Sequence, residues 1–392
     1  MLELAVIGFG NRARKYVSCL DGRARVAGIV EPSAYCRSYA VRAYGIDESR
    51  CFESLDALIA SGMRIDAAII ASPDRTHYDY ARRCIALGWP LLLEKPVATR
   101  LEECRELAGL SESSGVPVAV CYELRYHPFF LKLKELVSDP SLGRLLSVDW
   151  EVEVGLNRMM HSYVRGTWAR EAESGPITLT KLCHDVDLLL WMIPGEPLSW
   201  RSEGERRIFR AENAPEGAAE RCLDCPLERD CRYSAVDLYL RKHDWISNFM
   251  TFPGESTDEM LHRILKESDY GRCVFHSDND VNDTQTIEIC YPGGLRATIR
   301  MKCDRRGGRR TARFVFENGE VCADAYDITV RTASGECREY DFSDLRDKPL
   351  HAGADKTMTD DFISSVSEGL PLRCSIADAL RSHVICICDS GD

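Results

Sequence analysis

The strongest constraint on the fold is an alternation of short apolar runs with helical segments through the first 120 or so residues. The apolar runs, which we read as β-strands, are Leu4–Ile7, Val26–Val30, Ala67–Ala71, Leu91–Leu93 and Val118–Cys121. Strands that alternate with helices form a parallel sheet with helices on both faces. We therefore expect an α/β domain with a doubly wound parallel sheet at the N-terminus.

The turn after the first run is rich in glycine. It reads Gly8-x-Gly10-x-x-Ala13 and leads directly into a helical segment, with Asn11 and Arg12 at the start of that helix. Glycines in this position let the backbone approach a pyrophosphate, whose charge is met by the N-terminus of the helix. The context predicts a dinucleotide site, although an exposed helix start would explain Asn11 and Arg12 equally well.

Two further strand ends carry polar residues that suit the same ligand. Glu31 ends the second run, where a carboxylate would bind the adenosine ribose hydroxyls. A carboxylate repels a 2′-phosphate, so Glu31 favours NAD, while Arg37 nearby keeps NADP open. The Ser72-Pro73-Asp74 loop, with His77, follows the run at 67–71 and would pass under the nicotinamide ribose. A turn with a helix-capping role explains Asp74 equally well.

The run at 91–93 ends in Glu94-Lys95-Pro96. The carboxyl edge of such a sheet is where its ligands bind, so Lys95 is placed as a functional cation. A lysine that is partly desolvated beside a positively charged nicotinamide has a lowered pKa and can polarise or deprotonate a hydroxyl. The Lys95-Pro96 peptide bond is a candidate for the cis form.

A second constellation lies farther along the chain, in a segment that reads as a helix. Lys181, His184 and Asp187 are spaced three apart, so they can share one helical face. His184 there would bind a substrate hydroxyl or relay its proton. A histidine in isolation is more often a satisfied core residue, but beside Lys181 and the neighbouring carboxylates we favour an active-site role.

Together, the glycine turn, the Ser72-Pro73 loop with His77, Glu94-Lys95-Pro96 and His184 resemble the Gfo/Idh/MocA family of nicotinamide-dependent oxidoreductases over essentially the whole chain. The resemblance implies a Rossmann domain over residues 1–121 and a C-terminal α/β domain over residues 122–392, with a large, mostly antiparallel open sheet. It also implies a sugar- or cyclitol-like substrate and a homodimer or homotetramer. Lys95 would touch the reacting hydroxyl and the nicotinamide, and Glu94 would hold the cofactor side.

The sequence departs from the commoner pattern of that family. Many members carry an aspartate four residues before the histidine, where this chain has Thr180, followed by Lys181. Their proton relay therefore cannot simply be transferred, and Lys95 and Lys181 are the two candidate proton acceptors. Substrate contacts are expected, in addition, from Tyr122, Arg125, Arg165, Trp168 and Asp187.

Cysteines form a third constellation within an insertion at about 203–272. Cys222-x-x-Cys225 and Cys231 suggest one metal ion held in a tight turn. Similar sequences pair this cluster with a later cysteine, so Cys273 is the preferred fourth ligand, with His276 and His243 as alternatives. We expect a structural zinc ion; an iron-sulfur cluster or free thiols are the other interpretations.

Composition narrows the class of partner and the compartment. A net charge of −12 argues against nucleic acid or an anionic membrane. No apolar run approaches the ~18 residues of a membrane span, and no export signal precedes the first strand. We therefore expect a cytoplasmic protein, with the 18 cysteines as free thiols or metal ligands.

These features together predict an NAD(P)-dependent oxidoreductase that acts on a small sugar, a cyclitol or a derivative of one. Two alternatives remain. The same fold can use a transient oxidation to drive elimination or glycoside cleavage, regenerating NAD in each turnover. The chain could also be a non-catalytic sensor of a nucleotide and a sugar, although a sensor has no need of Lys95, Lys181 and His184 as proton acceptors.

Overall fold

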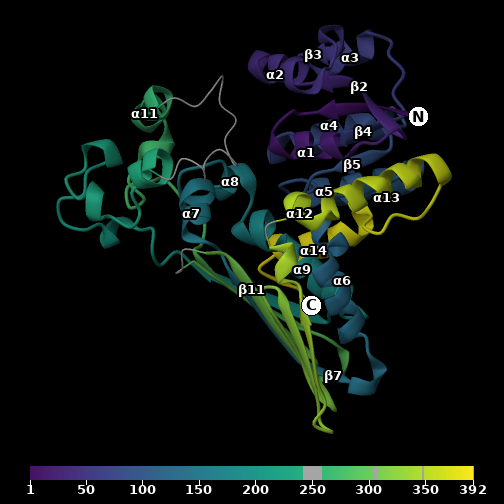
Figure 1. The fold of residues 1–392 in the computed structure, drawn as a ribbon, viewed down its shortest axis with the longest axis vertical. Coiled ribbons are helices and arrows are strands. Elements are labelled where there is room, and N and C mark those ends of the chain that lie inside the picture. Colours follow the sequence, from purple (N-terminus) through teal and green to yellow (C-terminus); the bar gives the residue numbers. More distant parts are fainter. Residues whose placement is uncertain (242–257, 304–306, 347, 392) are drawn as a thin grey trace. The chain divides into compact units, whose positions relative to one another are not determined.

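The computed structural model describes residues 1–241, 258–303, 307–346 and 348–391. The chain divides into two compact units. The first comprises residues 1–135, 183–194 and 342–384, and the second comprises residues 136–182, 195–341 and 385–392. Each unit contains one sheet, and Figure 1 shows both. The first unit thus takes in more of the chain than the predicted N-terminal domain of residues 1–121.

The sheet of the first unit has six strands in the order β3-β2-β1-β4-β5-β6, and every neighbouring pair is parallel. Their bounds are Leu2–Ile7 (β1), Ala24–Val30 (β2), Cys51–Phe52 (β3), Ala67–Ile70 (β4), Leu91–Leu93 (β5) and Val118–Val120 (β6). The order reverses between β1 and β4, and ligands of such sheets bind at the carboxyl ends of the strands that flank this reversal. The predicted doubly wound sheet is confirmed.

Helices follow most of these strands, and other helices of this unit come from later parts of the chain. The helices of the first unit include α1 (Asn11–Cys19), α2 (Ala34–Tyr44), α3 (Leu55–Ala60), α4 (His77–Ala86), α5 (Leu101–Ser114), α9 (Cys183–Met192), α12 (Pro349–Ala352) and α13 (Ala354–Glu368). Helix α6 (Pro128–Val137) begins in this unit, and most of α14 (Ile376–Ile387) lies in it.

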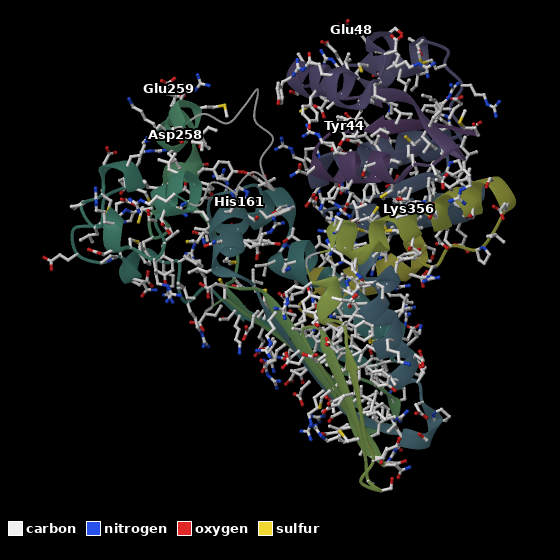
Figure 2. All side chains as sticks on the ribbon, in the orientation of Figure 1. Tyr44, Glu48, His161, Asp258, Glu259 and Lys356 are labelled. Atoms are coloured by element: carbon white, nitrogen blue, oxygen red, sulfur yellow. The ribbon has the colours of Figure 1, made fainter. Side chains whose placement is uncertain are left out.

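Helix α13 covers one face of the parallel sheet, beside α1 (Figure 1). Its buried residues Met358, Phe362 and Ile363 pack in one core with Leu4 of β1 and Leu92 of β5. Lys356, labelled in Figure 2, is partly exposed on the same helix and pairs with Asp21 and Asp360. The apolar face of a sheet must be covered by another element. Here α13, which is distant in sequence, covers it.

The sheet of the second unit has nine strands in the order β14-β13-β12-β11-β7-β10-β9-β8-β15. Their bounds are Leu145–Glu153 (β7), Ser199–Glu205 (β8), Thr284–Cys290 (β9), Arg296–Lys302 (β10), Arg309–Phe316 (β11), Gly319–Asp324 (β12), Asp327–Thr332 (β13), Cys337–Asp341 (β14) and Ser390–Gly391 (β15). Among the described strand pairs of this second sheet, only β7–β10 is parallel. The predicted mostly antiparallel open sheet is confirmed.

Alternation of side chains gives the nine-stranded sheet one apolar face. Val148, Trp150 and Val152 of β7 are buried, whereas Asp149 points to the other face and pairs with Arg300 of β10. The period of two is the one expected for a strand with a single buried face.

The cysteine-rich insertion packs against a turn of irregular helix at Met159–Val164. His161, labelled in Figure 2, lies in this turn and places Nδ1 3.0 Å from the hydroxyl of Tyr239. Its ring also stacks on Tyr270 at 5.1 Å. Burial lowers the pKa of His161 to about 3, so the ring is neutral and contributes by packing.

No helix in the described ranges has the length and apolar character needed to cross a membrane.

Candidate cofactor and active site

The glycine turn after β1 lies at the reversal of the strand order. Gly8 has φ +83°, and a Cβ atom there would lie 2.7 Å from the carbonyl oxygen of Ala71 and from the backbone of Ser72. Only glycine fits so close to the loop after β4. A Cβ atom at Gly10, by contrast, would meet no described atom within 4 Å beyond its chain neighbours, so the backbone there faces open space.

Gly10 is also the N-cap residue of helix α1. No side chain in the described structure caps the helix there, and no acidic residue lies in the first turn. The first N–H groups of a helix carry partial positive charge and lack partners within the helix. Open space beside such N–H groups fits a pyrophosphate. Asn11, Arg12 and Ala13 form this first turn, and the side chain of Ala13 is buried.

Glu31 lies at the carboxyl end of β2, beside the glycine turn. Its Oε2 accepts a hydrogen bond from the backbone N–H of Phe9 at 2.8 Å, and Oε1 accepts one from the N–H of Ser33 at 2.9 Å. Arg37 donates to the carbonyl of Glu31 at 2.7 Å and pairs with Glu53. Because these contacts engage the Arg37 guanidinium, the geometry favours a ribose hydroxyl over a 2′-phosphate next to Glu31.

His77 ties together the loops that follow β4 and β5. Its ring is fully buried, with Nδ1 2.6 Å from the carbonyl oxygen of Pro96 and Nε2 2.9 Å from that of Ser72. The predicted cofactor residues Ser72, Pro73 and Asp74 thus lie in a loop held against the Lys95-Pro96 turn. The contacts of His77 are those of a residue that positions the two loops.

Lys95 follows β5 at the carboxyl edge of the sheet, and its peptide bond to Pro96 is cis, as predicted. Its neighbour Glu94 is only 6% exposed and accepts a hydrogen bond from Arg12 Nε at 2.6 Å and another from the hydroxyl of Tyr16. Burial alone would raise the pKa of Glu94, but Arg12 and Lys95 outweigh it and hold this pKa below its ordinary value. Glu94 is therefore a carboxylate that is fixed next to Lys95.

The charge of Lys95 also affects the pKa of His383, a buried histidine of α14. His383 accepts a hydrogen bond from the N–H of Val97 at Nε2, and its Nδ1 lies 2.7 Å from the carbonyl oxygen of Ala379. Burial, together with the positive charge of Lys95, lowers the pKa of His383 to about 4. His383 is thus a neutral ring that fixes the backbone after Lys95.

His184 lies at the start of α9 in the first unit, with 12% of its side chain exposed. The ring of the buried Tyr122 meets the His184 ring edge-on, with centroids 5.4 Å apart. The Tyr122 hydroxyl lies 2.9 Å from that of Ser382. Lys181 lies in the turn Thr178–Leu182, which belongs to the second unit.

Arg125 and Asp187, both predicted to contact substrate, are paired with each other. Arg125 Nε and Nη2 each lie 2.7 Å from a different oxygen of Asp187, and the side chains are 3% and 1% exposed. Burial raises the pKa of Asp187 to about 6, although Arg125 opposes this shift. The ion pair connects α9, which contains Asp187, to the short helix Glu123–Tyr126, which contains Arg125.

Arg165 and Trp168 lie in the second unit, and Arg165 is engaged by the cysteine-rich segment. Its guanidinium donates to the carbonyls of Arg272 and Tyr233 at 2.7 and 2.8 Å, and Nη2 lies 3.6 Å from Cys222 Sγ. Trp168 stacks on Tyr163 at 5.6 Å. Arg165, which we expected at the substrate, is therefore a buried partner of this segment.

The four predicted metal ligands line one small cavity. Cys222, Cys225, Cys231 and Cys273 surround about 20 Å³. The N–H of Ala235 donates to Cys222 Sγ at 3.4 Å. Within the described ranges, however, no group of three or more cysteine, histidine or acidic side chains has the arrangement of a metal site, so zinc is not confirmed. His276 lies beside Glu220, and His243 falls outside the described residues.

Three residues that the sequence did not single out, Glu123, His351 and Asp355, lie beside predicted site residues of the first unit. Glu123 is 7% exposed and lies between two rings, with Oε1 3.9 Å from His184 Nε2 and 3.8 Å from His351 Nε2. Asp355 lies 2.9 Å from His351 Nδ1 and 2.8 Å from Arg12 Nη2. In the sequence, the only signal for these three residues is that Glu123 interrupts an apolar stretch. His351 and Asp355 belong to no motif.

Comparison with known proteins agrees with this architecture. A sequence model of an oxidoreductase family with an NAD-binding Rossmann fold matches residues 2–122. Inositol 2-dehydrogenase 2 of Saccharopolyspora erythraea is 32% identical over 53% of this chain and 58% of its own length. Inositol 2-dehydrogenase of Paracoccus denitrificans is 28% identical over 54% and 60%. This chain therefore spans less than two thirds of the length of these relatives.

Solved structures resemble the chain over nearly its full length. An oxidoreductase from Agrobacterium radiobacter, in complex with NAD+, L-tartaric acid and magnesium, has a TM-score of 0.71 at 15% identity and covers 98% of this chain and 94% of its own. UDP-N-acetylglucosamine 3-dehydrogenase from Acidithiobacillus ferrooxidans has a TM-score of 0.66 at 17% identity, with 98% and 95% covered. At such low identity the likeness establishes the fold.

Proposed function

Because residues 2–122 carry the NAD-binding domain of the Gfo/Idh/MocA oxidoreductase family, we propose that this chain is an NAD-dependent dehydrogenase of a sugar, a cyclitol or a derivative. It would interconvert a hydroxyl and a carbonyl group by hydride transfer. The observation that carries the proposal is Lys95, which stands at the carboxyl edge of the sheet beside a fixed carboxylate, Glu94. The inositol dehydrogenases among the relatives support the substrate class.

NAD is the cofactor that the first unit suits best. Its pyrophosphate would lie against the open backbone at Gly10 and the N-terminus of α1, and its adenosine ribose against Glu31. When bound, NAD supplies the nicotinamide carbon that accepts or returns the hydride. NADP remains the weaker alternative, because Arg37 already binds Glu53 and backbone carbonyls.

Lys95 would handle the substrate hydroxyl. Oxidation of a carbinol releases a proton as well as a hydride, so a group beside the hydroxyl must polarise it and accept that proton. Glu94 is poorly suited to this task, because Arg12 and Lys95 hold its pKa low. Lys95 and His184 remain, and Lys181 of the second unit is the other lysine that we propose as a proton acceptor.

A panel assay of sugars, cyclitols and sugar acids with NAD, read by NADH absorbance, tests the proposal. We expect NADH to form with at least one polyol. Lys95→Met should lower kcat by about 1,000-fold, while the Kd for NAD stays within about threefold of wild type. Lys356→Met, at a partly exposed lysine of α13, is the matched control and should keep full activity.

Other outcomes would replace this function. Wild-type turnover by Lys95→Met would remove the catalytic assignment. Product without net NADH would favour transient oxidation coupled to elimination or glycoside cleavage. Sugar binding without any product would favour a sensor. NADH absorbance detects the first function, product analysis by mass spectrometry detects the second, and a ligand-dependent rise in melting temperature detects the third, all with the same panel of sugars.

We also propose that the four thiols around the small cavity hold a structural metal ion, with zinc favoured by the all-sulfur donor set. Two contacts of these sulfur atoms are compatible with a ligand role. The N–H of Ala235 donates to Cys222 Sγ, and burial raises the pKa of Cys231 while the backbone of Tyr233 opposes that rise. From the family resemblance we further propose that the protein is cytoplasmic and forms a homodimer or homotetramer. Light scattering would measure the oligomeric state.

A further inference from the structure

Glu123 lies between two histidines, and one carboxylate oxygen faces both of them. Its Oε1 is 3.9 Å from His184 Nε2 and 3.8 Å from His351 Nε2, and its side chain is only 9% exposed. All three residues belong to the first unit. These distances suit ion pairs and become hydrogen bonds after a shift of about 1 Å, as catalytic contacts often do when a ligand binds.

A chain of alternating charges continues from His351. Its Nδ1 lies 2.9 Å from Asp355, which is fully buried, and Asp355 pairs with Arg12 at 2.8 Å. Arg12 in turn binds Glu94, the neighbour of Lys95. The chain therefore links the surroundings of Lys95 to those of His184 without passing through the substrate.

His351 is well placed to donate from both ring nitrogens. Burial alone would lower its pKa, but Asp355 and Glu123 raise it above the ordinary value. A protonated ring donates Nδ1–H to one carboxylate and Nε2–H to the other. Its backbone is in the left-handed region, with φ +48°, as are Leu350 and Ala352 at +54°. Three such residues in a row are strained, so the surrounding structure must hold this ring in place.

We propose that Glu123 is the positioning carboxylate of His184, and that His351 and Asp355 hold Glu123 in place. This inference rests on the proposed dehydrogenase function. Glu123 accepts the Nε2–H of His184, which places the lone pair of the neutral ring on Nδ1. With substrate and NAD bound, Nδ1 would take the proton that the substrate hydroxyl releases, Glu123 would stabilise the resulting imidazolium, and NAD would supply the acceptor for the hydride.

This assignment accounts for the departure at Thr180. Thr180 stands where many related enzymes carry an aspartate, and its hydroxyl donates to the carbonyl of Pro176 at 3.2 Å. Glu123 comes instead from the short helix after β6. Its other charged neighbours are Arg12 and Glu94, whereas burial keeps Tyr16 and Cys121 neutral. His184 and His351 therefore both lie within ion-pair distance of Glu123, and Arg12 is a further positive charge nearby.

Glu123→Gln keeps the shape of the side chain and removes its charge. We expect kcat to fall by about 100-fold and the pH dependence of kcat to change, with the Kd for NAD within about threefold of wild type. Glu123→Asp should recover part of the rate. Glu112→Gln, at an exposed glutamate of α5, is the matched control. An unchanged rate and pH profile in Glu123→Gln would overturn the assignment.

A second readout does not require a substrate. In protein with ¹⁵N-labelled histidine, the His184 signal, identified by its loss in His184→Gln, should report a proton on Nε2 in wild type. Glu123→Gln should shift it toward the Nδ1–H form, and an unchanged tautomer would overturn the proposal. If wild type turns over no sugar, the proposed function fails, yet the tautomer still decides the role of Glu123. If Glu123→Gln does not fold, His351→Gln should still alter the His184 titration, and no effect there would also count against the proposal.

Discussion

Arg12 Nη2 lies 2.8 Å from Asp355 Oδ1, although 343 positions separate the two residues. The same guanidinium donates from Nε to Glu94 at 2.6 Å. One arginine at the start of α1 thus joins the carboxylate beside Lys95 to helix α13. The position of Glu94 beside Lys95 therefore depends on Asp355, a residue of a distant segment of the chain.

Gly8→Ala and Gly10→Ala should separate folding from cofactor binding. A Cβ at residue 8 meets backbone at 2.7 Å with φ +83°, so we expect a loss of at least about 2 kcal/mol in the free energy of unfolding. At residue 10 the backbone has φ −78° and open space, so alanine should leave stability unchanged. It should nevertheless weaken NAD binding by about tenfold or more. Denaturant melts and NAD titration check both, and equal stability of the two variants would contradict the close approach at Gly8.

Arg125→Met should destabilise the first unit strongly. It leaves Asp187 buried without its charge partner, which costs about 3–5 kcal/mol. The double variant Arg125→Met/Asp187→Leu should regain much of that loss, because it removes both charges. Arg144→Ala breaks an exposed pair with Glu317 and should change stability by less than about 1 kcal/mol. Urea denaturation measures all three variants, and a small loss in Arg125→Met would mean that water reaches Asp187.

The His351–Asp355 pair should make stability depend on pH. The pKa of His351 is raised above 6.5, so its contribution is full below about pH 6.5 and is lost as pH rises through the folded-state pKa. The pKa of Asp355 is lowered to about 2, so its contribution is present above about pH 4 and is lost as pH falls toward 2. His351 is 37% exposed, and solvent screening limits the gain to about 1 kcal/mol.

His351→Gln is the variant that tests this dependence. Unfolding curves for wild type and His351→Gln should differ most between about pH 4 and 6.5 and should converge toward pH 9. A difference that stays constant across this range would show that the pair contributes by packing and not by charge.

The cysteine cluster gives a prediction about metal removal. Protein purified without added zinc should contain about one equivalent of metal per chain by mass spectrometry. A chelator should lower the melting temperature of wild type. Cys222→Ser and Cys273→Ser should lose the metal, whereas Cys337→Ser, at an exposed cysteine of β14, should keep it. Less than about half an equivalent in wild type would count against the site.

The sequence predicted those parts of the fold that depend on local pattern. Apolar runs and turn chemistry identified five of the six strands, the glycine turn and the cis bond before Pro96. Strand β3 was missed because two residues, Cys51 and Phe52, are too short to show a period. The position of α13 on the parallel sheet was not predicted, because helical periodicity does not identify the surface that a helix packs on.

The candidate site was predictable only where a motif marks it. Lys95 and the residues at the strand ends follow from the topology of parallel sheets. Glu123 and His351 come from segments more than 200 residues apart, and their meeting depends on how the chain returns to the first unit. Arg125 and Asp187 were predicted to contact substrate, and their pairing with each other was not predicted, because charge alone does not identify the partner of a charged residue.

The position of α13 has a consequence for synthesis on the ribosome. The strands of the parallel sheet emerge first, yet Met358 and Phe362, which pack against Leu4 and Leu92, are translated more than 200 residues after the last of those strands. Until then the nascent sheet exposes an apolar face to solvent. We therefore expect the N-terminal half of the chain to need chaperone protection during translation, and to complete its core only after most of the second unit has been made.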